Sequence, residues 1–313
     1  MRNSSGNKGT SKMKICYWGN VENCPRPTED MEILKALKEV AEVQFFDIKD
    51  FDMEKLIEGA NKSDIFLFHA LIPTADEVTQ MLVVERIQLV LRSVKVKKVL
   101  WFMEKVWMGK AGIIERLLPE VDHAFFTDET WVRRIKEPKA HALHPAAPIK
   151  PLQGEYTPEL ACDVAYVGQM YGMRPREYEF LKEQSGDAIR FYDNKYGQDL
   201  ADLCVSAKIL LTPRFPFDDY YWSDRIYTYL SMGGLVVHQR SQGLKDEGFE
   251  DGKVMFDYDR DQDLIALLGT LLEKGAEETR KVIAKNGKEF VKAHTYRVRV
   301  AELLKTCETK SIE

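Results

Sequence analysis

The sequence predicts an α/β protein made of two Rossmann-like, doubly wound domains that face each other across a cleft. Short apolar runs rich in β-branched and aromatic residues alternate with longer stretches of helical period, which is typical of parallel βαβ units. A proline-rich segment at residues 144–151 interrupts this alternation, which then restarts. A chain of 313 residues is long enough for two such domains.

The first part of the chain contains one complete set of strands and crossover helices. Five apolar runs predict the strands, and they lie at residues 14–18, 43–48, 65–68, 99–102 and 123–126. Stretches of helical period predict the connecting helices, at residues 29–40, at 53–60, in a long helix that ends near residue 94, and at 113–118. Five strands with their crossovers form one Rossmann-like sheet.

The segment at residues 144–151 holds three prolines, so it cannot continue a helix or a central strand and is interpreted as a linker. Beyond it we expect strands at residues 163–167, 189–192, 209–212, 235–238 and 254–256. The helices expected there lie at residues 175–184, 198–206, 223–232, 263–273, 277–292 and 296–307. The sequence therefore predicts a second doubly wound domain.

Composition excludes several classes of protein. With 45 basic and 50 acidic residues the net charge is −5, and neither half has the basic surplus that duplex nucleic acid requires of a partner. The most apolar stretch is too short to span a membrane, and the polar residues 1–12 lack the apolar stretch of a secretory signal. We therefore expect a flexible tail at residues 1–12, no membrane span and a cytoplasmic location.

Metal and disulfide signals are weak. The five cysteines are odd in number and contain no C-x-x-C pair, which disfavours disulfides and structural zinc. The pair of histidines in H-A-L-H at residues 141–144 has no third ligand nearby. The segment D-Y-D at residues 257–259 has the metal-binding D-x-D pattern, but D-x-D recurs elsewhere in this chain. We therefore expect neither a metal nor another cofactor.

The loop after the strand at residues 163–167 is a candidate anion site. It reads G-Q-M-Y-G-M-R-P-R, so glycines permit close backbone approach, and Arg174 and Arg176 lead into a helix. Arginines at a helix N-terminus suit a phosphate. The alternative is a plain glycine turn with two solvated arginines. The dinucleotide-binding and P-loop glycine motifs do not occur in the sequence.

The stretch at residues 222–244 is the most informative. At helical spacing Asp224 and Thr228 share one face, and Gly233 and Gly234 end the helix. After the next strand, a loop at Ser241, Gln242 and Gly243 could hold a diphosphate with its backbone amides. The alternative is an ordinary helix capped by Ser223.

These motifs resemble the glycosyltransferases of the GT-B fold, which have two facing Rossmann-like domains, and specifically their spore-maturation CgeB-like branch. The resemblance covers nearly the whole chain and is strongest in the second domain. It is carried by D-V-A-Y-V-G-Q-M-Y-G-M-R-P-R-E-Y at 163–178, S-D-R-I-Y-T-Y-L-S-M-G-G at 223–234, the pair Gly243 and Leu244, and H-T-Y-x-x-R at 294–299. The pieces W-F-M-E-K-V-W at 101–107 and T-D-E-T-W-V-R-R at 127–134 are similar as well.

The resemblance implies a donor site in the second domain for a nucleoside-diphosphate sugar. The residues expected to bind the donor are Gly168, Tyr171, Arg174, Arg176, Ser223, Asp224, Arg225, Thr228, Gln242, Gly243 and Leu244. One departure stands out, because many retaining relatives carry a glutamate where this chain has Thr228, and Tyr220 stands at the place of a second one. Substitutes for these glutamates could be Asp224, or Asp218 and Asp219.

Polar residues at strand ends of the first domain are expected to line the acceptor side. Glu104 is the best candidate for a base that deprotonates an acceptor hydroxyl, with a salt bridge to Lys105 or Lys110 as the alternative. The other candidates for catalysis are His69 and Asp128. A histidine in an apolar run is alternatively a core residue, and Asp128 is alternatively the cap of the following helix.

The expected function is transfer of a sugar, hexosyl or pentosyl, from a nucleoside-diphosphate sugar to a hydroxyl of a glycan, small molecule or protein, without a metal. Two alternatives stay open. One is a non-catalytic module that binds a nucleotide or sugar on the same fold, and the other is a nucleotide-sugar epimerase.

The expected domains are residues 13–148 on the acceptor side, residues 149–292 on the donor side, and a C-terminal helix at residues 293–313. The resemblance implies that this helix crosses back to the first domain. Its apolar stripe, which includes Val300, Leu303 and Leu304, must be buried somewhere.

Overall fold

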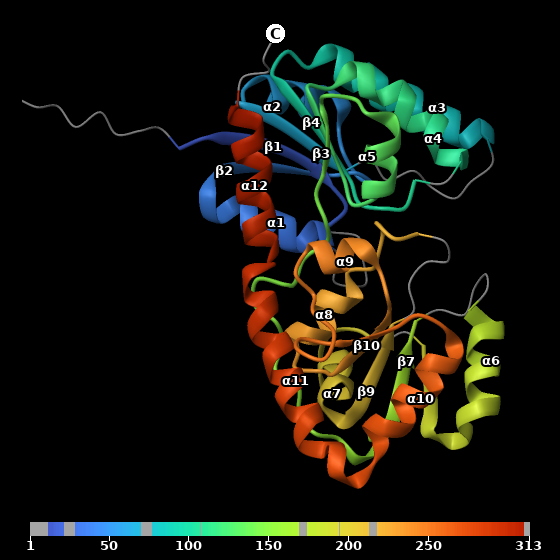
Figure 1. The fold of residues 1–313 in the computed structure, drawn as a ribbon. Helices are drawn as coiled ribbons and strands as arrows, with labels where there is room; N and C mark the ends of the chain where they lie inside the picture. The colour runs from blue at the N-terminus through green and yellow to red at the C-terminus, as the bar shows by residue number, and fades with distance from the viewer. Residues whose placement is uncertain are drawn as a thin grey trace, which may run out of the picture. The chain divides into compact units, whose positions relative to one another are not determined.

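A computed structural model describes most of the chain (Figure 1). The described residues are 12–21, 29–69, 77–106, 108–168, 174–193, 195–212 and 218–309. They form two sheets flanked by helices. The predicted α/β class with two parallel sheets is confirmed.

The first sheet has six strands in the order β2-β1-β3-β4-β5-β6. Its strands are β1 (Lys14–Gly19), β2 (Glu42–Asp47), β3 (Ile65–His69), β4 (Lys97–Phe102), β5 (His123–Phe126) and β6 (Ala140–Ala142). The helices of this part are α1 (Glu29–Val40), α2 (Met53–Asn61), α3 (Glu77–Ser93), α4 (Met108–Leu117) and α5 (Glu129–Ile135). Strand β1 pairs in parallel with β2 and β3, and β3 pairs in parallel with β4. Every residue of β3 is buried, as expected for a strand covered on both faces.

The second sheet has five strands in the order β11-β10-β9-β7-β8. They are β7 (Cys162–Val167), β8 (Ile189–Tyr192), β9 (Ala207–Thr212), β10 (Val236–Gln239) and β11 (Phe256–Tyr258). In both sheets the first strand lies between the second and the third, so the two sheets share one chain path. The path reverses direction between β7 and β9, and open α/β sheets bind ligands beyond the carboxyl ends of the strands at such a reversal.

Six longer helices accompany the second sheet in the described part of the chain. They are α6 (Arg174–Ser185), α7 (Gly197–Ser206), α8 (Arg225–Ser231), α10 (Asp261–Leu272), α11 (Glu277–Phe290) and α12 (Tyr296–Glu308). A short helix, α9, spans Gln242–Asp246.

The core of the second sheet has two halves, one on each face. Leu210 packs in a cluster with residues of α7 and α8, while its neighbours Ile209 and Leu211 pack in a cluster with residues of α6 and α10. This alternation is the period of two that a strand imposes on its side chains. Apolar residues at every position of a strand are therefore explained by helices on both faces.

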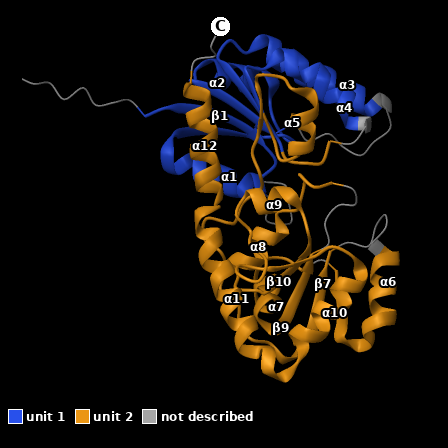
Figure 2. Cartoon of the chain, in the orientation of Figure 1, with its two compact units in different colours: residues 1–24, 28–102, 107–124 blue, residues 25–27, 103–106, 125–313 orange. Residues whose placement is uncertain are grey.

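By contacts between residues the chain divides into two compact units (Figure 2). Unit 1 contains residues 1–24, 28–102 and 107–124, and unit 2 contains residues 25–27, 103–106 and 125–313. The expected domain boundaries at residues 148 and 292, and the crossing of the last helix back to the first domain, stay predictions. The expected flexible tail lies outside the described residues, except Lys12.

All predicted strands and helices are present, β6 and α5 are additional to them, and three local differences stand out. Helix α4 begins at Met108 rather than 113, ahead of the range predicted from apolar spacing. Strand β11 begins at Phe256 rather than 254, because the Val254 N–H donates to the Glu250 carbonyl in a turn. The expected irregular loop at 241–243 is wrong, since α9 begins at Gln242.

We predict that Gly287→Ala destabilises the protein by about 1–3 kcal/mol, because overpacking outweighs the helix propensity of alanine. A Cβ at Gly287, in α11, would lie 2.5 Å from the Val254 carbonyl oxygen and 2.6 Å from Leu230 Cδ2. The matched control is Gly269→Ala in α10, where a Cβ meets nothing within 4 Å. The control should stabilise by about 0.5–1 kcal/mol. Thermal unfolding followed by circular dichroism measures both, and equal shifts for the two variants would contradict the prediction.

Candidate functional site

The carboxyl ends of β7 and β9 meet at the reversal point of the second sheet. Gly168 follows β7 with a positive φ of 157°, a conformation that glycine tolerates, and its N–H donates to the Tyr192 carbonyl at 3.1 Å. Thr212 ends β9, is buried, and its Oγ1 has no hydrogen-bond partner among the described residues. A buried hydroxyl without a partner is uncommon in proteins and indicates a place for a water or a ligand.

The loop after β7 supplies only part of the predicted donor site. Tyr171 and the side chain of Arg174 lie outside the described residues. Arg176 lies in the first turn of α6 with its side chain exposed. Gly168 and Arg176 therefore stand at the same end of β7, as expected, and their contact with a donor stays a prediction.

Residues 218–224 connect the second sheet to α8 and hold α9 in place. The Asp219 carbonyl accepts hydrogen bonds from the Gly243 N–H at 2.9 Å and from Ser241 Oγ at 2.6 Å. The Gly243 amide is therefore occupied and is not free to hold a diphosphate in this state. A Cβ at position 243 would lie 2.4 Å from the Trp222 ring, so glycine is required there for packing. Leu244 is buried.

The start of α8 differs in detail from the expectation. Asp224 occupies the N-cap position of α8 without a side-chain hydrogen bond to the first turn, whereas Ser223 Oγ accepts a hydrogen bond from the Arg225 N–H at 3.3 Å. Ser223 Oγ also donates to the Asp224 carboxylate at 2.9 Å. Thr228 is half-buried one turn further on. Asp224 is thus a carboxylate near Thr228, on the polar edge that the spacing predicted.

Asp128 and Asp218, both buried, hold the half-buried Lys105 between them. The Asp128 carboxylate accepts from Lys105 Nζ at 3.2 Å, from the Val106 N–H at 3.0 Å and from the Trp131 N–H at 3.1 Å. Lys105 also pairs with Asp218. Asp128 is therefore the cap of α5, as the alternative interpretation held, and its bonds leave it little freedom to act as a base.

Asp218 joins further segments to this network. Its carboxylate accepts hydrogen bonds from Thr130 Oγ1 at 2.5 Å and from the Tyr220 N–H at 2.9 Å. Tyr220 is held in turn by the Glu129 N–H, which donates to its carbonyl at 3.1 Å, and by the Arg133 guanidinium, 3.9 Å from its ring centroid. Asp218 is buried, so of the proposed substitutes for the missing glutamates Asp224 and Asp219 remain.

Glu104 lies between β4 and the residues that this network fixes. It is half-buried, and its neighbours Lys105 and Val106 are both bound to Asp128. Lys105 pairs with Asp128 and Asp218, and the alternative of a salt bridge from Glu104 to Lys105 or Lys110 stays a prediction beside the catalytic one. Glu104 keeps its place as the candidate base, and that role stays a prediction.

His69 is a buried residue of the first unit. Its Nδ1 lies 2.7 Å from the Asp30 carboxylate, and Asp30 also accepts from the Tyr17 hydroxyl. Burial lowers the pKa of His69, but the charge of Asp30 and the hydrogen bond to it have the larger combined effect and raise this pKa. This geometry favours the core interpretation of His69 over a catalytic one.

The motif H-T-Y-x-x-R brings two basic residues onto one glutamate that sequence reasoning did not single out. Glu247 lies 2.6 Å from Arg299 Nη2, 3.3 Å from His294 Nδ1 and 3.9 Å from His144 Nε2. Burial opposes its ionisation, but the hydrogen bond with His294 and the charges of Arg299 and His144 lower the pKa of Glu247 to about 2. No sequence signal identifies Glu247, because its partners are far away in the chain.

The D-Y-D segment engages an arginine. Arg240 Nη2 lies 2.6 Å from Asp257 Oδ1, and Arg240 Nη1 lies 2.5 Å from Asp259 Oδ2. Among the residues that the structure describes, no group of three histidine, cysteine, aspartate or glutamate side chains is arranged to hold a metal ion. The expectation that the protein uses no metal stays a prediction from the sequence.

The second sheet and its helices are similar in sequence to a known protein family. Residues 155–305, just under half of the chain, match a family described as glycosyl transferase-like. No curated protein sequence matches the chain. In the described ranges, no helix is long and apolar enough to cross a membrane.

Solved structures match nearly the full length. Anabaena HepE in complex with UDP and glucose has a TM-score of 0.60 at 11% identity, covering 94% of this chain and 99% of that one. An α-glucosyltransferase in complex with UDP and a 13-mer DNA has a TM-score of 0.66 at 11% identity, covering 96% and 100%. Sucrose-phosphate synthase from Thermosynechococcus elongatus has a TM-score of 0.61 at 11% identity, covering 94% and 98%. At this identity the likeness shows the fold alone, which is that of GT-B glycosyltransferases.

We predict that Glu247→Gln lowers the free energy of unfolding at pH 7 by roughly 3 kcal/mol, the value that a pKa lowered from 4.5 to about 2 implies. The folded-state pKa lies below the unfolded one, so this stabilisation is present above pH 4.5 and is lost as the pH falls toward 2. Urea unfolding at several pH values measures it. The variant should lose the wild-type decline across that window, whereas Glu250→Gln, at an exposed glutamate, should keep it.

Proposed function

We propose that the chain transfers a sugar from a nucleoside-diphosphate sugar to a hydroxyl acceptor. The observation that carries this proposal is the match of residues 155–305 to a glycosyl transferase-like family, since this range contains β7 and β9, between which the path of the second sheet reverses. Two of the similar structures hold UDP, which makes UDP-sugars the first donors to test.

The proposed donor site lies beyond the carboxyl ends of β7 and β9. The diphosphate lies beyond Gly168, where the backbone allows close approach, and Arg176 neutralises part of its charge. The Thr212 hydroxyl, buried and without a partner among the described residues, contributes a hydrogen bond. Ser223, Asp224, Arg225 and Thr228 face the sugar and ribose, as does the exposed Gln242, while Gly243 and Leu244 act through packing of α9.

The reaction breaks the bond between the anomeric carbon and the diphosphate oxygen and forms one to the acceptor oxygen. Positive charge develops on the sugar and negative charge on the leaving diphosphate, so the site must stabilise both. Glu104 accepts the proton of the acceptor hydroxyl. Asp128 acts as a positioning residue, because it binds Lys105 and Val106 next to Glu104.

Several finer features belong to the same proposal. We place the protein in the spore-maturation CgeB-like branch, with a hexose or pentose as the transferred sugar and no metal in the reaction. The acceptor is a glycan, a small molecule or a protein, and the location is cytoplasmic. The absence of duplex nucleic acid among the partners rests on the net charge of −5, and it stays a prediction because one similar structure contains DNA.

We predict that Arg176→Ala weakens UDP binding about tenfold to a hundredfold, because the loss of one charge-assisted hydrogen bond costs roughly 1.5–3 kcal/mol. Isothermal titration calorimetry measures the affinity. The matched control is Lys182→Ala, which removes one positive charge from the last turn of the same helix. If both variants bind UDP with the affinity of the wild type, Arg176 does not contact the diphosphate and the prediction is wrong.

We predict that Glu104→Gln lowers donor turnover by about 10²–10⁴-fold, the usual contribution of a general base, without changing the affinity for UDP. Release of UDP from UDP-sugars in the presence of an acceptor measures turnover. Glu115→Gln, at an exposed glutamate of α4, should leave turnover unchanged. If the wild-type protein binds UDP but neither transfers nor hydrolyses any nucleotide sugar, it is a binding module.

A further inference from the structure

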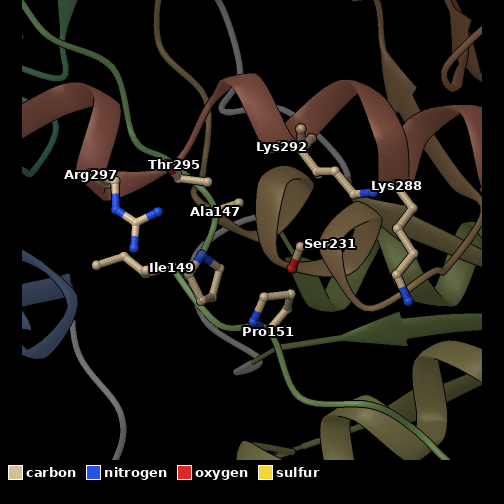
Figure 3. Close-up of a pocket in the computed structure, with 10 residues that line it drawn as sticks. Ala147, Ile149, Pro151, Ser231, Lys288, Lys292, Thr295 and Arg297 are labelled. Atoms are coloured by element: carbon tan, nitrogen blue, oxygen red, sulfur yellow. The ribbon is translucent and has the colours of Figure 1, made fainter. Parts of the chain in front are cut away.

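A pocket lies in unit 2 beside the linker at residues 144–151 (Figure 3). Its volume is about 260 Å³. Three segments contribute to it, namely the linker, the end of α8 and residues 288–297. The lining residues are Ala147, Pro148, Ile149, Pro151, Ser231, Lys288, Val291, Lys292, Thr295 and Arg297. None of these residues belongs to the proposed donor site.

The charged groups of this pocket are all positive. Lys288, Lys292 and Arg297 line it, and no acidic residue does. Lys288 Nζ lies 3.3 Å from the neutral amide oxygen of Gln153, so this contact leaves its charge uncompensated. Lys292 pairs with Glu289 at 2.6 Å, and Glu289 lies outside the lining. The pocket therefore attracts an anion.

The basic side chains lie at two places along the linker. In Figure 3, Arg297 and Ile149 lie on one side of Ala147 and Pro151, while Lys288 and Lys292 lie on the other. A ligand between them can be approached from both sides by positive charge. Arginine binds phosphate oxygens in a bidentate manner and lysine binds them as a point charge, so the combination suits a phosphate group.

The rest of the lining is apolar or hydroxyl-bearing. Pro148, Ile149, Pro151 and Val291 supply apolar surface, which suits a short carbon skeleton. The hydroxyl groups of Ser231 and Thr295 are close by, and Ser231 Oγ donates to the Thr228 carbonyl at 2.7 Å. Ligand pockets for drug-sized molecules have volumes of roughly 300–1,000 Å³, so this pocket is too small for a nucleotide sugar.

We propose that this pocket binds a small phosphate monoester. The dianion neutralises the positive lining, and its organic part packs on the prolines and Ile149. The proposal is independent of the proposed function, because none of the residues that line the pocket is among those proposed to bind the donor.

Binding at this pocket would join two segments that are already paired. The Ala147 N–H donates to the His294 carbonyl at 2.8 Å, and the Tyr296 N–H donates to the Ala147 carbonyl at 3.1 Å. Ala147 belongs to the linker, and Thr295 and Arg297 belong to the start of the last helix. A ligand that touches both segments stabilises this pairing, so it raises the melting temperature of the protein.

The test is calorimetric titration of the full chain with glycerol 3-phosphate, with glycerol and potassium chloride of equal ionic strength as controls. The wild type should bind the phosphate ester saturably and bind neither control. Lys288→Gln combined with Arg297→Gln should weaken binding at least about tenfold. Lys285→Gln, which removes an exposed charge from α11 outside the pocket, should not change it.

Two further arms separate this pocket from the donor site. Binding of glycerol 3-phosphate should persist in Arg176→Ala and in the presence of saturating UDP. The proposal is overturned if the wild type shows no saturable binding, if the double variant binds like the wild type, or if Arg176→Ala or UDP abolishes binding. A protein that does not bind UDP at all would refute the donor site and leave the outcome at this pocket unaffected.

Discussion

The half-buried Lys105, held between the buried carboxylates of Asp128 and Asp218, makes the interaction on which the arrangement of the candidate site most depends. It ties together the residues after β4, the first turn of α5 and the segment that leads to α8. Removing charges from water is costly, and a buried pair is tolerable only when further hydrogen bonds satisfy its atoms. The N–H groups of Val106, Trp131 and Tyr220 and the hydroxyl of Thr130 supply those bonds. Segments that bear functional groups are fixed here by charge, whereas the sheets are fixed by apolar packing.

Regular elements could be predicted from the sequence because each carries its own signal. The run I-F-L-F at 65–68 is apolar at every position because both faces of β3 are covered, and α11 begins at Glu277, where the helical period begins. Helix α9 could not be predicted, because Q-G-L-K-D has little helical character and depends on the Asp219 carbonyl. The same limit applies to the site. Strand ends pointed to Gly168 and Glu104, but the partners of Glu247 come from two distant segments, and only the folded chain brings them together.

The capping role of Asp128 and the packing role of Gly243 show that residues singled out for chemistry also have structural roles. Both residues occupy positions where a ligand contact is plausible, after a strand and at the start of a helix. In the folded chain, helix capping, ion pairing and close packing against Trp222 account for both. Residue type and spacing identify where a polar atom stands. The neighbours that arrive from elsewhere decide whether that atom is available.

The common strand order of the two sheets has a consequence for the division of labour between them. A duplicated chain path creates two equivalent reversal points, and the reversal point of the first sheet lies at the carboxyl ends of β1 and β3. There His69, Asp30 and Tyr17 form a buried polar network, and a Cβ on Gly19 would come within 2.5 Å of Asp30 Oδ1. At the corresponding position of the second sheet stands the buried Thr212 hydroxyl, and both this hydroxyl and His69 Nε2 have no hydrogen-bond partner among the described residues. Two copies of one architecture thus carry different chemistry at the same place, an ionisable histidine–aspartate pair in the first sheet and a neutral hydroxyl in the second.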